Sequence, residues 1–111
     1  MLKKNYLLEF QENDDELLVY LNGEIDHHSA VIIRSRIDER IIEKSPRRLV
    51  LDLSNIDFMD SSGLGLIMGR YAKVKAIGGT FAVQNPNERI VKIFKLAGLE
   101  KIVEIKENKD E

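Results

Sequence analysis

Apolar strands and amphipathic helices alternate along the sequence, and this order constrains the fold more than any other feature. Three short runs, at 17–21, 49–53 and 80–84, have the aliphatic composition of strands. Two segments between them, 29–43 and 61–77, carry apolar residues at the spacing of three and four that is typical of a helix. Strands that alternate with helices predict an α/β fold, with a mostly parallel sheet and right-handed crossovers.

Two further strands are predicted near the ends of the chain. The run 6–10 precedes a polar turn at 12–16, so we expect it to form an antiparallel hairpin with 17–21. The run 102–105 is a last short strand. Together these elements give a mixed sheet of four to five strands.

A third helix is expected between the last two strands. Asn85 is its expected N-cap, with Pro86 in the first helical position and Glu88 in the third. Gly98 is expected to end it in a left-handed conformation, with Leu99 packing back against the helix.

Length and charge exclude several classes of protein. The chain has 111 residues, which fits one domain over 1–111, and we expect its ends at 1–5 and 106–111 to be frayed. The formal net charge of -2 gives no electrostatic case for nucleic-acid binding, and the absence of cysteine excludes a disulfide framework. No apolar run approaches the ~18 residues that a membrane span needs, so we expect a cytoplasmic protein without membrane contact.

The most unusual stretch is 57–65, which joins a predicted strand to a predicted helix. It places the hydroxyls of Ser61 and Ser62 at the N-terminus of the helix, where free backbone N–H groups and the helix dipole favour a negative charge. The alternative is purely structural. Asp60 or Ser61 is then an N-cap, and the glycines let the helix pack closely.

Three glycines within this one helix need a reason. Each of Gly63, Gly65 and Gly69 costs roughly 0.5–1 kcal/mol of stability relative to alanine. We expect the compensation to be the close approach of another backbone, either from this chain's own sheet or from a partner.

Several catalytic motifs can be excluded. No Gly-Lys pair occurs, which excludes a Walker phosphate loop. Met68 stands where a dinucleotide fingerprint beginning at Gly63 needs a glycine, and Met59 stands where a nucleophile elbow around Ser61 needs one.

The segment 26–28 (DHH) has the residue types of a metal site. Adjacent histidines point apart and the chain has only 2 histidines, so we expect a solvated turn and no metal. Asp26, like Ser29, is also a candidate N-cap of the following helix. Asp26 and Asp60 each follow a predicted strand, so their loops are expected to meet at one edge of the sheet. Acid–base catalysis is one use of such a pair, but we expect an acidic docking patch for a basic partner.

At these motifs the sequence resembles a known family, the STAS domain of anti-sigma-factor antagonists. The resemblance lies in 23–30 (GEIDHHSA), 58–71 (FMDSSGLGLIMGRY), 77–79 (IGG) and 96–99 (LAGL), and covers nearly the whole chain. Within the family the motifs are most similar to the sporulation branch, with the general-stress antagonists next. The resemblance implies a sheet with helices packed mainly on one face.

The resemblance implies a regulatory switch and not an enzyme, and no cofactor. A kinase that is also an anti-sigma factor phosphorylates the first serine after the aspartate, here Ser61, with Ser62 as the second choice. The unphosphorylated antagonist binds the anti-sigma factor and frees the sigma factor, and a serine phosphatase resets it. Asp26, Asp60, Ser62 and Gly63 are then expected to contact the partner. A small-nucleotide-binding module is the alternative, because the helix N-terminus favours anions.

Overall fold

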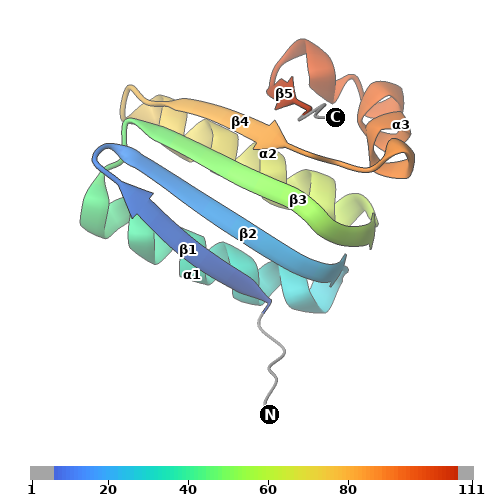
Figure 1. Ribbon diagram of the computed structural model, residues 1–111, viewed down its shortest axis with the longest axis horizontal. Coiled ribbons are helices and arrows are strands. Elements are labelled where there is room, and N and C mark those ends of the chain that lie inside the picture. Colours follow the sequence, from blue (N-terminus) through green and yellow to red (C-terminus); the bar gives the residue numbers. More distant parts are fainter. Residues whose placement is uncertain (1–6, 108–111) are drawn as a thin grey trace.

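A five-stranded sheet runs through the molecule, with the strand order β1-β2-β3-β4-β5 (Figure 1). The computed structural model describes residues 7–107. β1 pairs with β2 in antiparallel fashion, and all other neighbours pair in parallel, which confirms the expected hairpin and the mostly parallel sheet. The strands are β1 Leu8–Asn13, β2 Glu16–Ile25, β3 Arg48–Met59, β4 Thr80–Gln84 and β5 Glu104–Lys106.

The two long helices cover one face of this sheet, as the family resemblance implied (Figure 1). A third, shorter helix packs beside the C-terminal part of β3 and is followed by a 3-10 turn. The helices are α1 His27–Lys44, α2 Ser61–Ala76, α3 Glu88–Ala97 and the 3-10 helix η1 Leu99–Lys101.

The core lies between the sheet and the helices. Leu49, Leu51 and Leu53 of β3 are fully buried, because alternate side chains of a strand share one face. The apolar stripe expected on α1 is confirmed, since its buried residues include Ala30, Ile33, Ile37 and Ile41.

The buried face of α2 agrees only in part with the expected one. Of the apolar residues at helical spacing in this segment, Ile67 and Val74 are buried as expected, whereas Leu64, Met68 and Tyr71 are only partly buried. The fully buried positions are Gly63, Leu66, Ile67, Arg70 and Val74. The helix is therefore turned so that Arg70 faces α1, where its Nε lies 2.9 Å from Asp38 Oδ1.

β2 and β3 are longer than the sequence predicts. The second strand is expected over 17–21, but its parallel pairing with β3 continues through Asn22 and Gly23 to Ile25 and Met59. Two register shifts, between Tyr20 and Asn22 and between Gly23 and Glu24, accommodate the extra residues of β3. Gly23 has a φ of 92°, which glycine adopts without strain.

The third helix begins two residues later than expected. Asn87, and not Asn85, is its N-cap, with Oδ1 accepting a hydrogen bond of 2.8 Å from the N–H of Ile90. Asn85 instead has a φ of 59° and donates from Nδ2 to Asp52 at 3.1 Å. Gly98 ends the helix in the left-handed conformation, as expected.

The C-terminal strand also lies later than expected. β5 covers Glu104–Lys106, and Lys106 pairs with Gln84, so the chain is not frayed at this residue. Of the other positions expected to be frayed, 1–5 and 108–111 fall outside the described residues.

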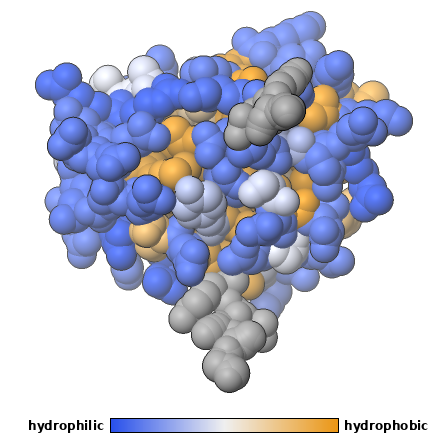
Figure 2. All heavy atoms as spheres, in the orientation of Figure 1, coloured by the Kyte–Doolittle hydropathy of each residue, from blue (hydrophilic) through white to orange (hydrophobic). Residues whose placement is uncertain are grey.

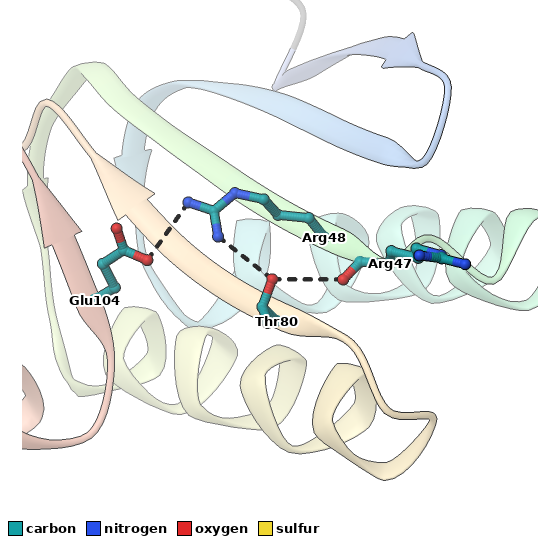
Figure 3. A network of polar contacts seen from close by, with 4 residues as sticks. All are labelled: Arg47, Arg48, Thr80 and Glu104. Carbon is teal, nitrogen blue, oxygen red and sulfur yellow. Dashed lines mark hydrogen bonds and ion pairs between the residues drawn. The ribbon is translucent and has the colours of Figure 1, made fainter.

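The face of the sheet opposite α1 and α2 carries a polar network. Arg48 reaches from the start of β3 across β4, donating to Thr80 Oγ1 at 3.3 Å and to Glu104 Oε1 on β5 at 3.4 Å (Figure 3). Figure 2 shows mainly hydrophilic residues over this face, with apolar residues between them.

Candidate functional site

The ends of β2 and β3 bring two loops together. Ile25 and Met59 form the last register pair of the two strands. The N–H of Asp60 donates to the carbonyl oxygen of Ile25 at 3.2 Å. Asp26 and Asp60 therefore lie at the same carboxyl edge of the sheet, which confirms that the two loops meet.

Asp26 is the N-cap of α1. Its Oδ1 accepts a hydrogen bond of 2.9 Å from the N–H of Ser29, while Ser29 Oγ accepts one of 3.1 Å from the N–H of Asp26. This reciprocal pair is a capping box. The hydrogen bond from the Ser29 backbone holds the pKa of Asp26 below its usual value, so the carboxylate stays charged well below neutral pH. Asp26 is exposed, and capping leaves it accessible to a partner.

Asp60 has the same role at the start of α2. Its Oδ1 accepts a hydrogen bond of 2.8 Å from the N–H of Ser62. Ser61 is the first residue of the helix and is exposed, and within residues 7–107 its hydroxyl makes no hydrogen bond. The fold thus presents a free hydroxyl to solvent directly beside a carboxylate.

Gly63 packs tightly beneath this first turn. A Cβ at this position would lie 2.7 Å from Met59 Cβ and 2.8 Å from Met59 Sδ. Gly63 is buried in the fold. Glycine is needed here to seat α2 on the end of β3, and contact of this first turn with a partner stays a prediction.

Gly65 and Gly69 have no such neighbour. Apart from the adjacent backbone of α2 itself, a Cβ added at either position would meet no heavy atom of residues 7–107 within 4 Å. The expected close approach of the chain's own backbone is therefore wrong for these two glycines. They leave open space beside α2.

The same substitution at two of these glycines should have opposite effects. Gly65→Ala is expected to raise the free energy of unfolding by about 0.5–1 kcal/mol, because alanine has the higher helix propensity and space is available. Gly63→Ala is expected to lower it by about 1–3 kcal/mol, because the new methyl group overlaps Met59. Urea denaturation of both variants measures this contrast, and a shift of the same sign in both would contradict the packing described.

Asp52 is a buried carboxylate to which the sequence pattern assigns no role. Its Oδ2 accepts from Gln84 Nε2 at 2.7 Å and from Asn85 Nδ2 at 3.1 Å, and its Oδ1 accepts from Ser54 Oγ at 2.6 Å. Burial favours a raised pKa, but these hydrogen bonds outweigh it, so the pKa of Asp52 lies below its usual value. The carboxylate ties β3 to the loop that leads into α3.

Stability should therefore fall in acid partly through Asp52. A depressed pKa stabilises the folded state above the unfolded value of about 3.9, and this stability is lost as the pH falls through the folded pKa. Asp52→Asn places an NH2 group opposite two donors and is expected to cost about 1–3 kcal/mol at neutral pH. Urea denaturation at pH 7 and pH 3 is expected to show the difference from wild type shrinking in acid. A difference independent of pH would contradict this account of Asp52.

The adjacent histidines do not build a metal site with other residues that the structure describes. Across 7–107, no group of three or more His, Cys, Asp or Glu side chains is placed to hold an ion. His27 and His28 are exposed in the first turn of α1.

Comparison with known proteins places the chain in a family. A family model described as the STAS domain matches residues 8–111. The chain belongs to the STAS domain family. Over residues 7–107, no helix of this STAS domain combines the length and the apolar composition that crossing a bilayer requires.

The relatives of this STAS domain include anti-sigma-factor antagonists. It is 39% identical to the anti-sigma F factor antagonist of Paenibacillus polymyxa, over 94% of this chain and 89% of that protein. It is 31% identical to the anti-sigma-B factor antagonist of Bacillus subtilis (strain 168), over 91% of each chain. The expected similarity to both branches of the family is confirmed.

Solved structures give the same result. The anti-sigma factor antagonist SpoIIAA in its unphosphorylated form is 27% identical and superposes with a TM-score of 0.81, covering 93% of this chain and 89% of that chain. The phosphorylated form of the Bacillus cell fate determinant SpoIIAA has a TM-score of 0.74 at 27% identity, covering 93% and 92%.

Proposed function

We propose that this STAS domain is an anti-sigma-factor antagonist switched by phosphorylation of Ser61. Its unphosphorylated form binds an anti-sigma factor with serine kinase activity and releases the sigma factor. Phosphorylation ends the binding, and a serine phosphatase restores it. The proposal is carried by the Ser61 hydroxyl, which is exposed beside Asp60 and makes no hydrogen bond to the part of the chain that the structure describes, in a chain 39% identical to an anti-sigma F factor antagonist.

The docking surface in this proposal is the acidic edge formed by the ends of β2 and β3. Asp26 and Asp60 are exposed there, and Ser62 is half-buried next to them. The pKa of Asp26 is held low by its capping hydrogen bond, so it presents a full negative charge at neutral pH. We propose that Asp26 and Asp60 pair with Arg or Lys side chains of the anti-sigma factor.

Phosphorylation acts through charge. In the proposed reaction Ser61 Oγ attacks the γ-phosphorus of ATP, ADP leaves, and the hydroxyl proton passes to a base of the kinase. The product carries about -1.5 to -2 additional charges, so the net charge moves from -2 to roughly -4. Asp60 already accepts the N–H of Ser62, so the helix N-terminus offsets only part of this charge. An interface packed on Ser61 must then bury an uncompensated charge, which costs several kcal/mol.

We propose a binding role for this chain and not a catalytic one, and a location in the cytoplasm, where sigma factors act. Both carboxylates of the site are engaged as helix caps. Asp26 is a poor general base at neutral pH, because its pKa is low. We propose no cofactor.

Nucleotide binding is the less favoured alternative. The N–H of Ser62, which would donate to a phosphate, is occupied by Asp60, and the charge of that carboxylate repels phosphate. Titration with ATP and GTP by calorimetry is expected to show no binding at millimolar concentrations. Clear saturation would favour a nucleotide-binding module.

The phosphoacceptor is tested by mapping the modification. The chain is incubated with ATP and the anti-sigma F factor of P. polymyxa, and in parallel with the anti-sigma-B factor of B. subtilis, and digested for mass spectrometry. We expect one phosphate on Ser61, none in Ser61→Ala, and normal incorporation in Ser62→Ala. Phosphate on Ser62 instead would make Ser62 the phosphoacceptor. Modification at any other residue would contradict the proposed switch.

A further inference from the structure

A groove of about 400 Å³ lies between α1 and α2 and opens next to the proposed docking edge. Ser62, at the start of α2, lines it, so the groove continues directly from the proposed phosphorylation site. The other lining residues that matter here are Val31, Arg34, Gly65, Gly69 and Arg70.

The two glycines keep this groove open. Apart from the adjacent backbone of α2, no described atom lies within 4 Å of a Cβ built on Gly65 or Gly69, so packing among the described residues does not require glycine there. Both glycines carry a cost in helix propensity. The space they leave lies next to Arg70 in the groove of about 400 Å³.

Arg70 is a buried cation with incomplete partners. Only 4% of its side chain is exposed, and Nε lies 2.9 Å from Asp38 Oδ1, on α1. The Nε–H is not directed at this oxygen, and Nη1 has no hydrogen-bond partner among the described residues. Buried donors are almost always paired, so Nη1 of this guanidinium, which lines the groove beside the Asp38 ion pair, still lacks an acceptor among the described residues.

Arg34 adds a second positive charge to the same groove. Arg34 and Arg70 line the same groove. Burial lowers the pKa of Arg70, the charge of Asp38 raises it, and the charge of Arg34 lowers it. Within residues 7–107, no ion pair to Arg34 is formed. Two cations therefore face one carboxylate, and the groove has an excess of positive charge beside an acidic edge.

We propose that this groove receives an aspartate or glutamate side chain of the anti-sigma factor. The carboxylate would accept hydrogen bonds from Arg70 Nη1 and from the guanidinium of Arg34, while Val31 and the open surface of Gly65 and Gly69 contact its aliphatic part. This inference rests on the proposed function, because it assigns a second contact to the same partner.

A protein side chain fits this groove better than a free anion does. The groove is continuous with the docking edge, so a partner seated on Ser61 and Asp26 covers it at the same time. An acidic edge and a basic groove side by side demand a partner with the opposite charges in the same order. A negatively charged edge beside a positively charged groove fixes the register of a complex and disfavours partners with a different charge pattern.

The test reverses one charge on each side of α1. Arg34→Glu places a negative charge in the groove. Arg36→Glu is the matched control, because Arg36 is exposed on another side of the helix, where it lines a separate groove with Phe10 and Arg40. Both residues are exposed, so we expect both variants to keep the unfolding midpoint of wild type. Calorimetry with the anti-sigma F factor of P. polymyxa is expected to show a loss of affinity of about tenfold or more for Arg34→Glu and less than about twofold for Arg36→Glu.

The acidic residue of the partner is then identified by charge swaps. Each Asp or Glu of the anti-sigma factor is replaced by Lys and tested against Arg34→Glu, and one of these swaps is expected to restore binding. If Arg34→Glu binds as tightly as wild type, the groove is not a contact site for the partner, and the proposed function is left intact. Failure of every charge swap to restore binding would have the same meaning. If the wild-type chain forms no complex with the anti-sigma factor, both the groove contact and the proposed function are contradicted.

Discussion

Ser61→Asp is expected to bind the anti-sigma factor at least about tenfold more weakly than the unmodified chain. The new carboxylate stands beside the exposed cap Asp60, at the first position of α2. A partner packed on this edge must desolvate it, and a loss of only ~1.4 kcal/mol corresponds to tenfold. Aspartate carries less charge than phosphate, so the phosphorylated chain should lose more. Calorimetry against the anti-sigma F factor of P. polymyxa measures the affinity.

Two controls separate charge from structure. Ser61→Ala is expected to bind within about twofold of wild type, because the Ser61 hydroxyl makes no hydrogen bond within 7–107. Ser45→Asp adds the same charge at the C-cap of α1, at the opposite end of α1 from Asp26 and the docking edge. This variant should bind as wild type does. Equal affinities of Ser61→Asp and Ser61→Ala would remove the electrostatic mechanism.

Asp26→Asn is expected to weaken the complex by about tenfold to hundredfold while leaving the fold unchanged. Asparagine caps a helix as well as aspartate does, so the hydrogen bond to the N–H of Ser29 is kept and only the charge is lost. If a buried Arg or Lys of the partner pairs with Asp26, the loss leaves that cation unpaired. Binding is measured by calorimetry and stability by thermal unfolding.

The matched control removes a charge far from the docking edge. Asp14 lies in the exposed turn between β1 and β2 with a φ of 44°, a conformation that asparagine tolerates. Asp14→Asn should bind as wild type does. If Asp26→Asn binds equally well, Asp26 is a helix cap only and the docking edge is reduced to Asp60 and Ser62.

The order of strands and helices follows from local patterns, and these were sufficient for the fold. Apolar alternation around Leu51 and the apolar spacing at Ile33 and Ile37 place the main elements correctly. Element ends were less well predicted, because they depend on distant partners. β2 runs through Asn22 and Gly23 because β3 lies alongside, and Asn87 caps α3 while Asp52 holds Asn85.

The candidate site was predictable only in part. The two aspartates follow strands and precede helices, so their capping roles and shared edge could be read from the sequence. The groove could not, because it depends on how α1 and α2 cross. The Arg70–Asp38 pair joins residues far apart in sequence, and a helical pattern places arginine on the exposed face by default. Only the unexplained glycines at 65 and 69 gave a signal that space was needed.

The most direct test of the switch uses the phosphate itself. The chain is phosphorylated enzymatically and purified, and its affinity for the anti-sigma factor is measured before and after treatment with a serine phosphatase, with Ser61→Ala carried through the same steps. We expect binding to be lost on phosphorylation, regained on dephosphorylation, and constant in Ser61→Ala. A phosphorylated chain that binds as tightly as the untreated chain would contradict the account.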